Sequence, residues 1–281
     1  MTPPDEGECK LLSDVIQERF GLSFAGARRD ILLSRVRPRL AALRLPTLLD
    51  YYHFLRCHPD REAEFERLSC QLTNNETYFF REPHHFAIIA TNVVAALGDT
   101  LRTRPLRVLS AGCSSGEEPY SLAIALHDAA LGLRGIRWEI DACDLNRDRI
   151  ARAREGVYEG GSLRACDAEA VRRHFESQNG GRHRLRDRYR KSVRFFEANL
   201  AAPGGMIGFP PYDVVLCRNL LIYFDDAGFD RTIRLFARAL APGGWLFLGH
   251  SESLIDRSDE FVPTWLEGAM IYRKPLAEAA A

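Results

Sequence analysis

The sequence predicts an α/β protein with a doubly wound, largely parallel sheet, preceded by a helical region. Residues 8 to about 72 place apolar residues three and four positions apart, which is typical of amphipathic helices. From about residue 105, short apolar runs rich in β-branched residues alternate with helical patterns, which favours a parallel sheet covered on both faces. Residues from roughly 156 to 192 interrupt this alternation, so we interpret them as an insertion.

The composition is that of an ordinary soluble globular protein. The chain has 281 residues, 46% of them hydrophobic, and its 38 basic residues balance 38 acidic ones, so no net field attracts nucleic acid or a membrane. The polar start MTPPDEGECK and the lack of any apolar stretch of ~18 residues predict a cytoplasmic protein without signal peptide or membrane insertion. Seven cysteines without a CxxC pair predict free thiols, and no disulfide or zinc framework.

The helical region contains three clear amphipathic segments. They are CKLLSDVIQERFGL, ARRDILLSRVRPRLAALR and LLDYYHFLR, separated by proline-containing loop signals at 45–46 and 58–59. Pro38 lies inside the second segment, and proline removes a helical hydrogen bond, so we expect that helix to kink or restart there.

The later region contains six strand patterns. In order they are LRVLSA, WEIDACD, VRFFEAN, YDVVLCRN, GWLFLGH and a closing AMIYRK at 269–274.

The stretch LSAGCSSGEEPYSL (109–122) reads as strand, tight turn and helix. Gly112 and Gly116 permit positive φ or a close backbone approach, and Pro119 suits a first helical turn. This is the first βα crossing of a doubly wound sheet, where ligands bind at the carboxyl ends of the strands.

Two carboxylates, Glu117 and Glu118, follow this turn, and neither GxGxxG nor GxxxxGK[ST] is present. The acids would repel a pyrophosphate but would attract a cofactor that has an ammonium group and no phosphate, which S-adenosylmethionine satisfies. The alternative is that both acids only complement the helix dipole, worth ~0.3–1 kcal/mol each.

Asp144 ends the second strand pattern, about thirty residues after the turn. An acid there can accept hydrogen bonds from both ribose hydroxyls of an adenosine. Alternatively, Asp144 is the N-cap of the helix that DLNRDRIARAR predicts.

Five motifs together resemble one known family, the chemotaxis-receptor glutamate O-methyltransferases of the CheR type. They are NNETYFFREPHHF (74–86), SAGCSSGEEPYSLA, DACDLN, CRNLLIYFD (217–225) and GHSES (249–253), in the family's order. The resemblance implies a small all-helical N-terminal domain (1–75), a linker and helix bearing TYFFRE (76–104), and a Rossmann-like S-adenosylmethionine-dependent methyltransferase domain (105–281). It also implies an inserted antiparallel β-subdomain (156–192).

The resemblance further implies the activity and the site. The protein would act as a monomer, methylating glutamates of chemoreceptor cytoplasmic domains for signalling adaptation and leaving S-adenosylhomocysteine. Asp144 would bind the ribose, and Glu117 rather than Glu118 the amino head. The implied cofactor contacts are Asn75, Thr77, Arg81, Glu117, Asp144, Asn199, Leu200, Asn219 and Leu220, and Arg81 and Tyr223 are the implied catalytic residues.

Structural alternatives exist for three of these residues: an N-cap for Thr77, a surface ion pair for Arg81 and a core position for Tyr223. The chemistry itself asks for little, because a glutamate with a pKa of ~4.3 is already an ionised nucleophile at neutral pH. No general base or metal is needed. The site must align the reactants, which contributes ~7–11 kcal/mol to such a step. Arg81 would orient the carboxylate of the substrate or of the cofactor.

Two basic patterns suggest partner surfaces. Arg28, Arg35 and Arg39 fall on one helical stripe that would dock an acidic receptor helix, or would simply be a solvated face. In the insertion, arginines recur at 182, 184, 186, 188 and 190, and this two-residue period would place all five on one face of a strand. They would bind an anionic partner, or they would keep an edge strand charged and so prevent aggregation. The short turn SQNGGRH argues against tethering by a receptor pentapeptide.

Two rival functions remain for comparison. FPPYD (209–213) is similar to the PPY motif of nucleic-acid amino methylases, but it precedes a strand where that motif follows one. The other rival is a non-catalytic S-adenosylmethionine-binding module of a signalling complex.

Overall fold

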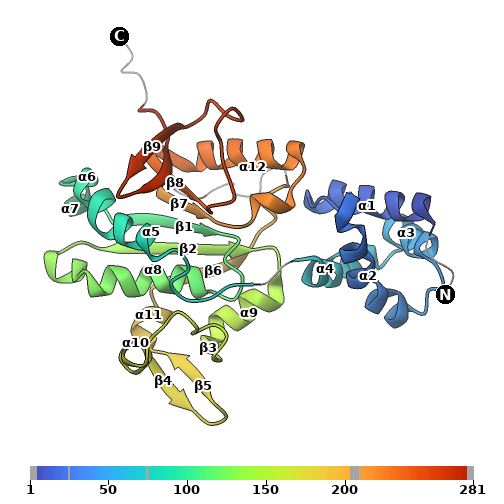
Figure 1. Ribbon diagram of the computed structural model, residues 1–281, viewed down its shortest axis with the longest axis horizontal. Coiled ribbons are helices and arrows are strands. Elements are labelled where there is room, and N and C mark those ends of the chain that lie inside the picture. Colours follow the sequence, from blue (N-terminus) through green and yellow to red (C-terminus); the bar gives the residue numbers. More distant parts are fainter. Residues whose placement is uncertain (1–4, 25, 74–75, 203–208, 210, 277–281) are drawn as a thin grey trace.

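A computed structural model describes residues 5–24, 26–73, 76–202, 209 and 211–276. Two parts are evident along the chain, a helical N-terminal part and a larger α/β part (Figure 1). Within the described ranges, no helix combines the length and the apolar character needed to cross a membrane.

The N-terminal part is a small helical domain with its own apolar core, which includes Leu12, Tyr51 and Leu68. Its helices are α1 (Glu6–Phe20), α2 (Arg29–Leu43), α3 (Leu48–Cys57) and α4 (Arg61–Leu72), with a 3-10 turn at Gly26–Arg28. Helix α2 continues through Pro38, so the predicted restart is wrong. Pro38 lies on the exposed side of α2, where its ring meets solvent.

The α/β part is built on a seven-stranded sheet of order β6-β2-β1-β7-β8-β10-β9. The strands are β1 (Leu106–Ala111), β2 (Trp138–Asp144), β6 (Val193–Glu197), β7 (Tyr212–Cys217), β8 (Leu240–Leu248), β9 (Val262–Leu266) and β10 (Ala269–Arg273). The first five strands in that order run parallel, and β10 and β9 are antiparallel additions. All six predicted strands are present; β9, which contains a proline, was not anticipated.

Successive side chains of the central strands point alternately into two apolar layers, as expected for a sheet covered on both faces. Val108 packs in one layer with α8 (Glu117–Asp128), whereas its neighbour Leu109 packs in the other with α12 (Asp226–Ala239). Figure 1 shows α8 and α12 on opposite sides of the sheet. Outside the insertion, the other described helices of this part are α5 (Pro83–Ile88), a π-helical turn (Ile89–Val93), α6 (Val94–Leu97), α7 (Thr100–Thr103), α9 (Arg147–Glu155) and 3-10 turns at Leu131–Arg134 and Leu221–Tyr223.

The insertion forms a separate antiparallel sheet of order β3-β5-β4. It comprises β3 (Val157–Tyr158), α10 (Ala168–His174), β4 (Phe175–Gln178), β5 (Arg182–Leu185) and α11 (Asp187–Arg190). The prediction of five arginines on one strand face is therefore wrong, because β5 ends at Leu185 and a helical turn follows. Asp187 in that turn pairs with Arg190 at 2.8 Å, three residues later.

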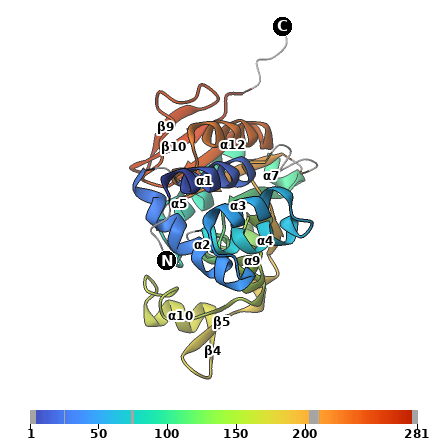
Figure 2. The ribbon, with the colours of Figure 1, turned by 90° about the vertical axis from the view of Figure 1, so that its right-hand side faces the viewer.

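The N-terminal domain contacts the α/β part closely around one loop, and Figure 2 shows helices α1–α4 in front of the sheet. The Ser23 amide donates to the Tyr223 carbonyl at 2.9 Å, and Leu22 forms a β-bridge with Phe224. Gly21 has φ +71°, and an added Cβ would lie 2.5 Å from the Ala201 Cβ, so this contact requires glycine.

Candidate functional site

A cavity of about 230 Å³ lies where the N-terminal domain meets the carboxyl ends of β1, β2 and β7. This is where open α/β sheets bind their ligands. Its walls come from the helical domain, the segment before α5 and the loops after β1, β2, β6 and β7. Lining residues include Phe20, Arg28, Arg35, Thr77, Arg81, Gly112, Ser114, Glu118, Asp144, Leu145, Asn199, Leu200, Arg218, Asn219, Leu220 and Tyr223.

The turn after β1 forms one wall and has the predicted left-handed glycines. Gly112 has φ +80° and Gly116 has φ +92°. An added Cβ on Gly112 would meet Leu220 at 3.0 Å, and one on Gly116 would meet Ala153 at 2.9 Å. The turn is held to the next strand because the amides of Gly112 and Cys113 both donate to the Cys143 carbonyl. The backbone here can therefore approach a ligand closely.

Asp144 ends β2 at the cavity, 9% exposed. Its carboxylate accepts the amides of Ser114 and Asn146, each at 2.8 Å. Burial raises the pKa of Asp144, and these amides act in the opposite direction. The alternative role of helix N-cap belongs instead to Asn146, whose side chain accepts the Asp148 and Arg149 amides at 3.1 Å. Asp144 therefore ties the glycine turn to β2 and presents a carboxylate to the cavity.

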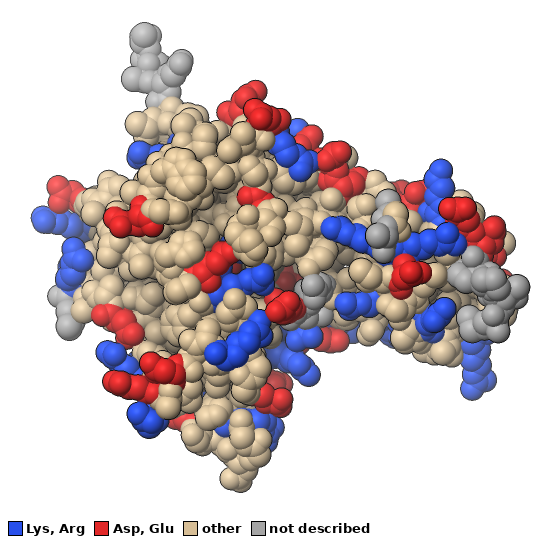
Figure 3. Space-filling model, viewed as in Figure 1, with Lys and Arg blue, Asp and Glu red and all other residues tan. Residues whose placement is uncertain are grey.

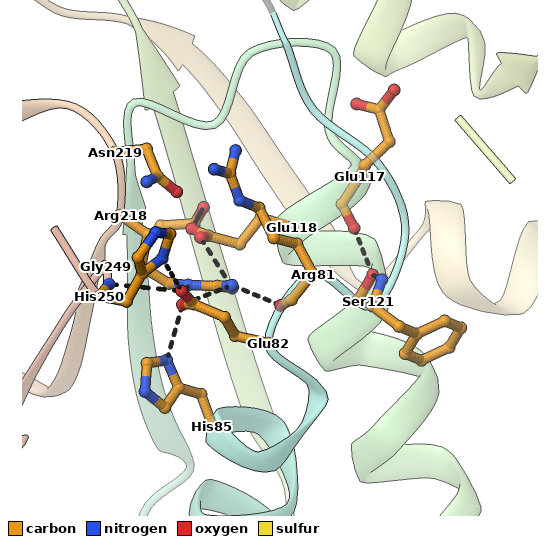
Figure 4. Close-up of polar contacts among 12 residues, drawn as sticks. Arg81, Glu82, His85, Glu117, Glu118, Ser121, Arg218, Asn219, Gly249 and His250 are labelled. Carbon is orange, nitrogen blue, oxygen red and sulfur yellow. Dashed lines mark hydrogen bonds and ion pairs between the residues drawn. The ribbon is translucent and has the colours of Figure 1, made fainter. Parts of the chain in front are cut away.

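The two acids after the glycine turn point in different directions. Glu118 lines the cavity, accepts the Ser110 hydroxyl at 2.6 Å and pairs with Arg218 at 3.3 Å. Glu117 is 1% exposed and accepts hydroxyl hydrogen bonds from Ser115 at 2.9 Å and Ser162 at 2.8 Å. Figure 4 shows its carboxylate pointing away from Glu118 and Arg218. The geometry thus favours Glu118 over the expected Glu117 as the acid that meets a ligand.

Both members of the expected catalytic pair line the cavity. Arg81 follows Phe80 in the turn before α5, and its Nη1 lies 3.5 Å from the Glu76 carbonyl. Tyr223 ends a 3-10 turn, and the guanidinium of Arg28 lies over its ring, 5.8 Å from the centroid. Thr77 also lines the cavity and is no N-cap, since α5 begins only at Pro83.

The remaining expected contacts lie on the loops after β6 and β7. Leu200 and Leu220 supply apolar lining, and the side-chain Nδ2 of Asn199 donates to the Arg19 carbonyl at 2.8 Å. Asn219 has φ +59°, and its buried Oδ1 has no hydrogen-bond partner among the described residues. An unsatisfied buried acceptor beside a cavity is a place for a ligand donor. Asn75 lies outside the described residues.

The sequence did not predict the placement of three acidic or basic side chains at this cavity: Glu118 and Arg218 line it, and Glu252 supports one loop of its wall. Glu252 accepts the amides of Asn219, Leu220, Leu221 and Gly249 at 2.7–2.9 Å. It thereby holds the CRNLL loop in its conformation, including the positive φ of Asn219. The signal was available, because Glu252 lies in GHSES and Arg218 in CRNLL, but neither spacing shows which side chains turn inward.

The polar groups that line the cavity fit an adenosine cofactor that has an ammonium group and no phosphate. Asp144, at the end of β2, and Glu118, in the first turn of α8, both line the cavity, as does Glu76, which pairs with Arg164. The unpaired oxygen of Asn219 offers a further acceptor, and leucines 145, 200 and 220 provide an apolar wall. Among the described residues, no group of three or more His, Cys, Asp or Glu side chains is arranged to hold a metal ion.

Comparison with known proteins agrees with this geometry. Residues 7–73 match the family domain described as CheR methyltransferase, all-alpha domain, and residues 75–266 match CheR methyltransferase, SAM binding domain. The chain is 35% identical to a chemotaxis protein methyltransferase of Salmonella typhimurium, covering 93% of this chain and 88% of the relative. It is 34% identical to the Escherichia coli protein of the same name, with the same coverage.

A third relative belongs to a differently named group. The chain is 34% identical to a probable biofilm formation methyltransferase, WspC, of Pseudomonas aeruginosa, covering 92% of this chain and 60% of that protein. The cofactor is S-adenosylmethionine, as the matched domain's description states. By its domains, its fold and its relatives, the chain belongs to the CheR methyltransferase family.

Proposed function

We propose that this protein transfers a methyl group from S-adenosylmethionine to glutamate side chains in the cytoplasmic domains of chemoreceptors, giving glutamate methyl esters. The observation that carries the proposal is a single cavity that gathers Asp144, Glu118, Arg81 and Tyr223 between the helical domain and the sheet. The names of the relatives, chemotaxis protein methyltransferases, support the receptor as substrate.

The residues divide into those that bind the cofactor and those that position the substrate. Asp144 accepts the ribose hydroxyls, and Glu118 pairs with the amino head in place of the expected Glu117. Asn219 accepts a hydrogen bond through its unpaired Oδ1, and Leu200 and Leu220 flank the adenine. When bound, the cofactor supplies an electrophilic methyl group on a sulfonium.

Arg81 and Tyr223 act on the substrate carboxylate. A glutamate is ionised at neutral pH, so the protein has to align it and exclude water rather than remove a proton. Arg81 holds one carboxylate oxygen, which leaves the other with its nucleophilicity, and the Tyr223 hydroxyl steadies the reacting groups. Both side chains line the cavity that also contains the two cofactor acids.

The receptor docks on the helical domain beside the cavity, in our proposal. Arg28 and Arg35 support this, because both line the cavity. Arg28 is held there by a hydrogen bond to the Ile222 carbonyl at 2.8 Å. Arg39 is not part of the docking surface that we propose, because it forms a two-bond ion pair with Glu64, at 2.8 and 2.6 Å. Over the face in Figure 3, basic and acidic side chains are intermixed, so docking depends on local arginines rather than on a uniform field.

A methyl-transfer assay tests the proposal. Labelled S-adenosylmethionine is incubated with receptor cytoplasmic fragments, and base-labile methanol is scored. Matched fragments with the methylated glutamates changed to alanine are the control. Methanol release that disappears in the control supports the proposal. Cofactor binding without methyl transfer to any receptor fragment would support the non-catalytic module instead.

A further inference from the structure

A buried cluster of charged residues adjoins the cavity, centred on Arg218. Its side chain is 2% exposed and lies directly after β7. Nε donates to Glu82 at 3.1 Å, Nη1 pairs with Glu118 at 3.3 Å, and Nη2 donates to the carbonyl of Arg81. Figure 4 shows the guanidinium between the two carboxylates. One side chain thus joins the turn before α5, the start of α8 and the end of β7.

The turn that carries Arg81 needs such support, because its two flanking residues are in the left-handed region. Phe80 has φ +57° and Glu82 has φ +50°. Non-glycine residues persist in this region only where surrounding contacts hold them, and they gather at functional sites. Here the Phe80 amide donates to the Ser121 hydroxyl at 2.8 Å, and His250 Nδ1 lies 2.7 Å from Glu82. Arg218 supplies the bond to the central residue of the turn.

The same guanidinium acts on the charge of Glu118. Burial raises the pKa of the Glu118 carboxyl, and Arg218 is the strongest influence that lowers it, followed by the Ser110 hydroxyl. Glu82 and Glu252 act in the raising direction on this pKa. The other titratable groups nearby are the buried thiols Cys113 and Cys217, the cavity-lining Arg81 and Asp144, and two histidines that contact Glu82, His250 at 2.7 Å and His85 at 3.7 Å. Four backbone amides compensate Glu252. Glu82 and Glu118 share Arg218.

We propose that Arg218 is a positioning residue for methyl transfer, which holds the turn that carries Arg81 and pairs with Glu118 at the cavity wall. The inference rests on the proposed function, since it assigns Arg81 to the substrate and Glu118 to the cofactor's amino head. It has two separable consequences. Loss of the bond to the turn displaces Arg81 and slows transfer. Loss of the positive charge makes Glu118 easier to protonate and weakens cofactor binding.

Two variants separate these consequences. Arg218→Lys keeps the positive charge, but an ammonium group cannot donate to the Arg81 carbonyl, Glu82 and Glu118 in the planar arrangement of a guanidinium. We expect its kcat to fall ~10-fold or more while its Kd for S-adenosylhomocysteine stays within ~3-fold, as for loss of one hydrogen bond from a charged group. Arg218→Met removes the charge as well, so both kcat and affinity fall.

The pH dependence of binding is a readout that a purely structural role would not change. Calorimetry with S-adenosylhomocysteine is run from pH 6 to 8. In Arg218→Met the affinity should fall as the pH is lowered, by up to ~10-fold per unit below the new pKa of Glu118. Adding Glu118→Gln to Arg218→Met should abolish that slope. Arg218→Lys should follow the wild-type profile.

Arg104→Met is a matched control, because Arg104 forms a two-bond pair with Asp213 at the start of the same strand, at 2.7 and 2.6 Å. It should lower the melting temperature without changing the pH profile or the ratio of kcat to affinity. If Arg218→Met does not fold, Glu82→Gln replaces it. This change weakens the charged contacts by which Glu82 holds the turn to Arg218 and His250, but it leaves the cation beside Glu118, so kcat should fall at unchanged affinity.

The outcomes are distinct. A wild-type protein that binds no S-adenosylhomocysteine refutes the proposed function itself. A second set of results overturns only the role of Arg218. In it the wild type binds and methylates, kcat is unchanged in Arg218→Lys or Glu82→Gln, and Arg218→Met has a wild-type pH profile.

Discussion

Replacing Asp144 tests the cofactor site at its most constrained carboxylate. Each of its two interactions with the backbone, to the amides of Ser114 and Asn146, is 2.8 Å long. In Asp144→Asn, one side-chain oxygen is replaced by an amide that must face one of these N–H donors, so that bond is lost. Asp144→Ala removes both bonds and both acceptors for the ribose.

The expected magnitudes follow from the strength of hydrogen bonds to charged groups, ~1.5–3 kcal/mol each against ~0.5–1.5 for neutral ones. Two ribose bonds lost in Asp144→Ala should weaken S-adenosylhomocysteine binding by ~3–6 kcal/mol, or ~10²–10⁴-fold. Asp144→Asn keeps weaker neutral contacts and should lose ~2 kcal/mol, about 30-fold. Isothermal titration calorimetry measures both, and urea unfolding reports whether the variants remain folded.

Asp141→Asn is the matched control, since Asp141 is a buried carboxylate three residues earlier on β2. It pairs with Arg194 at 2.7 Å, accepts the Tyr212 hydroxyl at 2.8 Å and is absent from the cavity wall. This control should lose stability but bind as the wild type does. Wild-type affinity in folded Asp144→Ala would remove Asp144 from the site and refute the reasoning.

Four further predictions concern catalysis, acid stability, docking and the stability of the helical domain. Arg81→Ala should reduce kcat by far more than it reduces cofactor affinity, and equal losses in kinetics and calorimetry would assign Arg81 to the cofactor. Burial, and then Arg218, lower the pKa of His85 to about 3, so His85 takes up a proton on unfolding below pH ~6.5. Urea titrations should therefore show ~2 kcal/mol less free energy of unfolding at pH 5 than at pH 7. In His85→Gln the free energy of unfolding should depend less on pH. Raising salt from 50 to 500 mM shortens the Debye length from ~14 to ~4 Å and should raise the KM for receptor, which Arg35→Glu should mimic. Arg39→Glu should instead destabilise the fold by ~3–5 kcal/mol, because it replaces the two-bond cationic partner of the buried Glu64 by a second acid; a folded variant with only a raised KM would contradict this.

The sequence by itself determined the order of the elements and the place of the site. Strand and helix periodicities reflect which side chains are buried along one local segment, so the six strand patterns appear where they were expected. Gly112 and Gly116 revealed the turn after β1, since positive φ is a property of single residues. The acids near that turn indicated a cofactor with an ammonium group, and the order of the motifs indicated the family.

The tertiary structure decided which side chains face the cavity. Glu117 and Glu118 are adjacent, and successive helical residues diverge by about 100°, so only the packing of α8 determines which one faces the cavity. Arg39 looked like part of a docking stripe until α4 placed the buried Glu64 against it. Arg218 meets partners that lie 100 and 136 residues away along the chain. Interactions of this kind leave no local periodicity, because they depend on how distant segments pack.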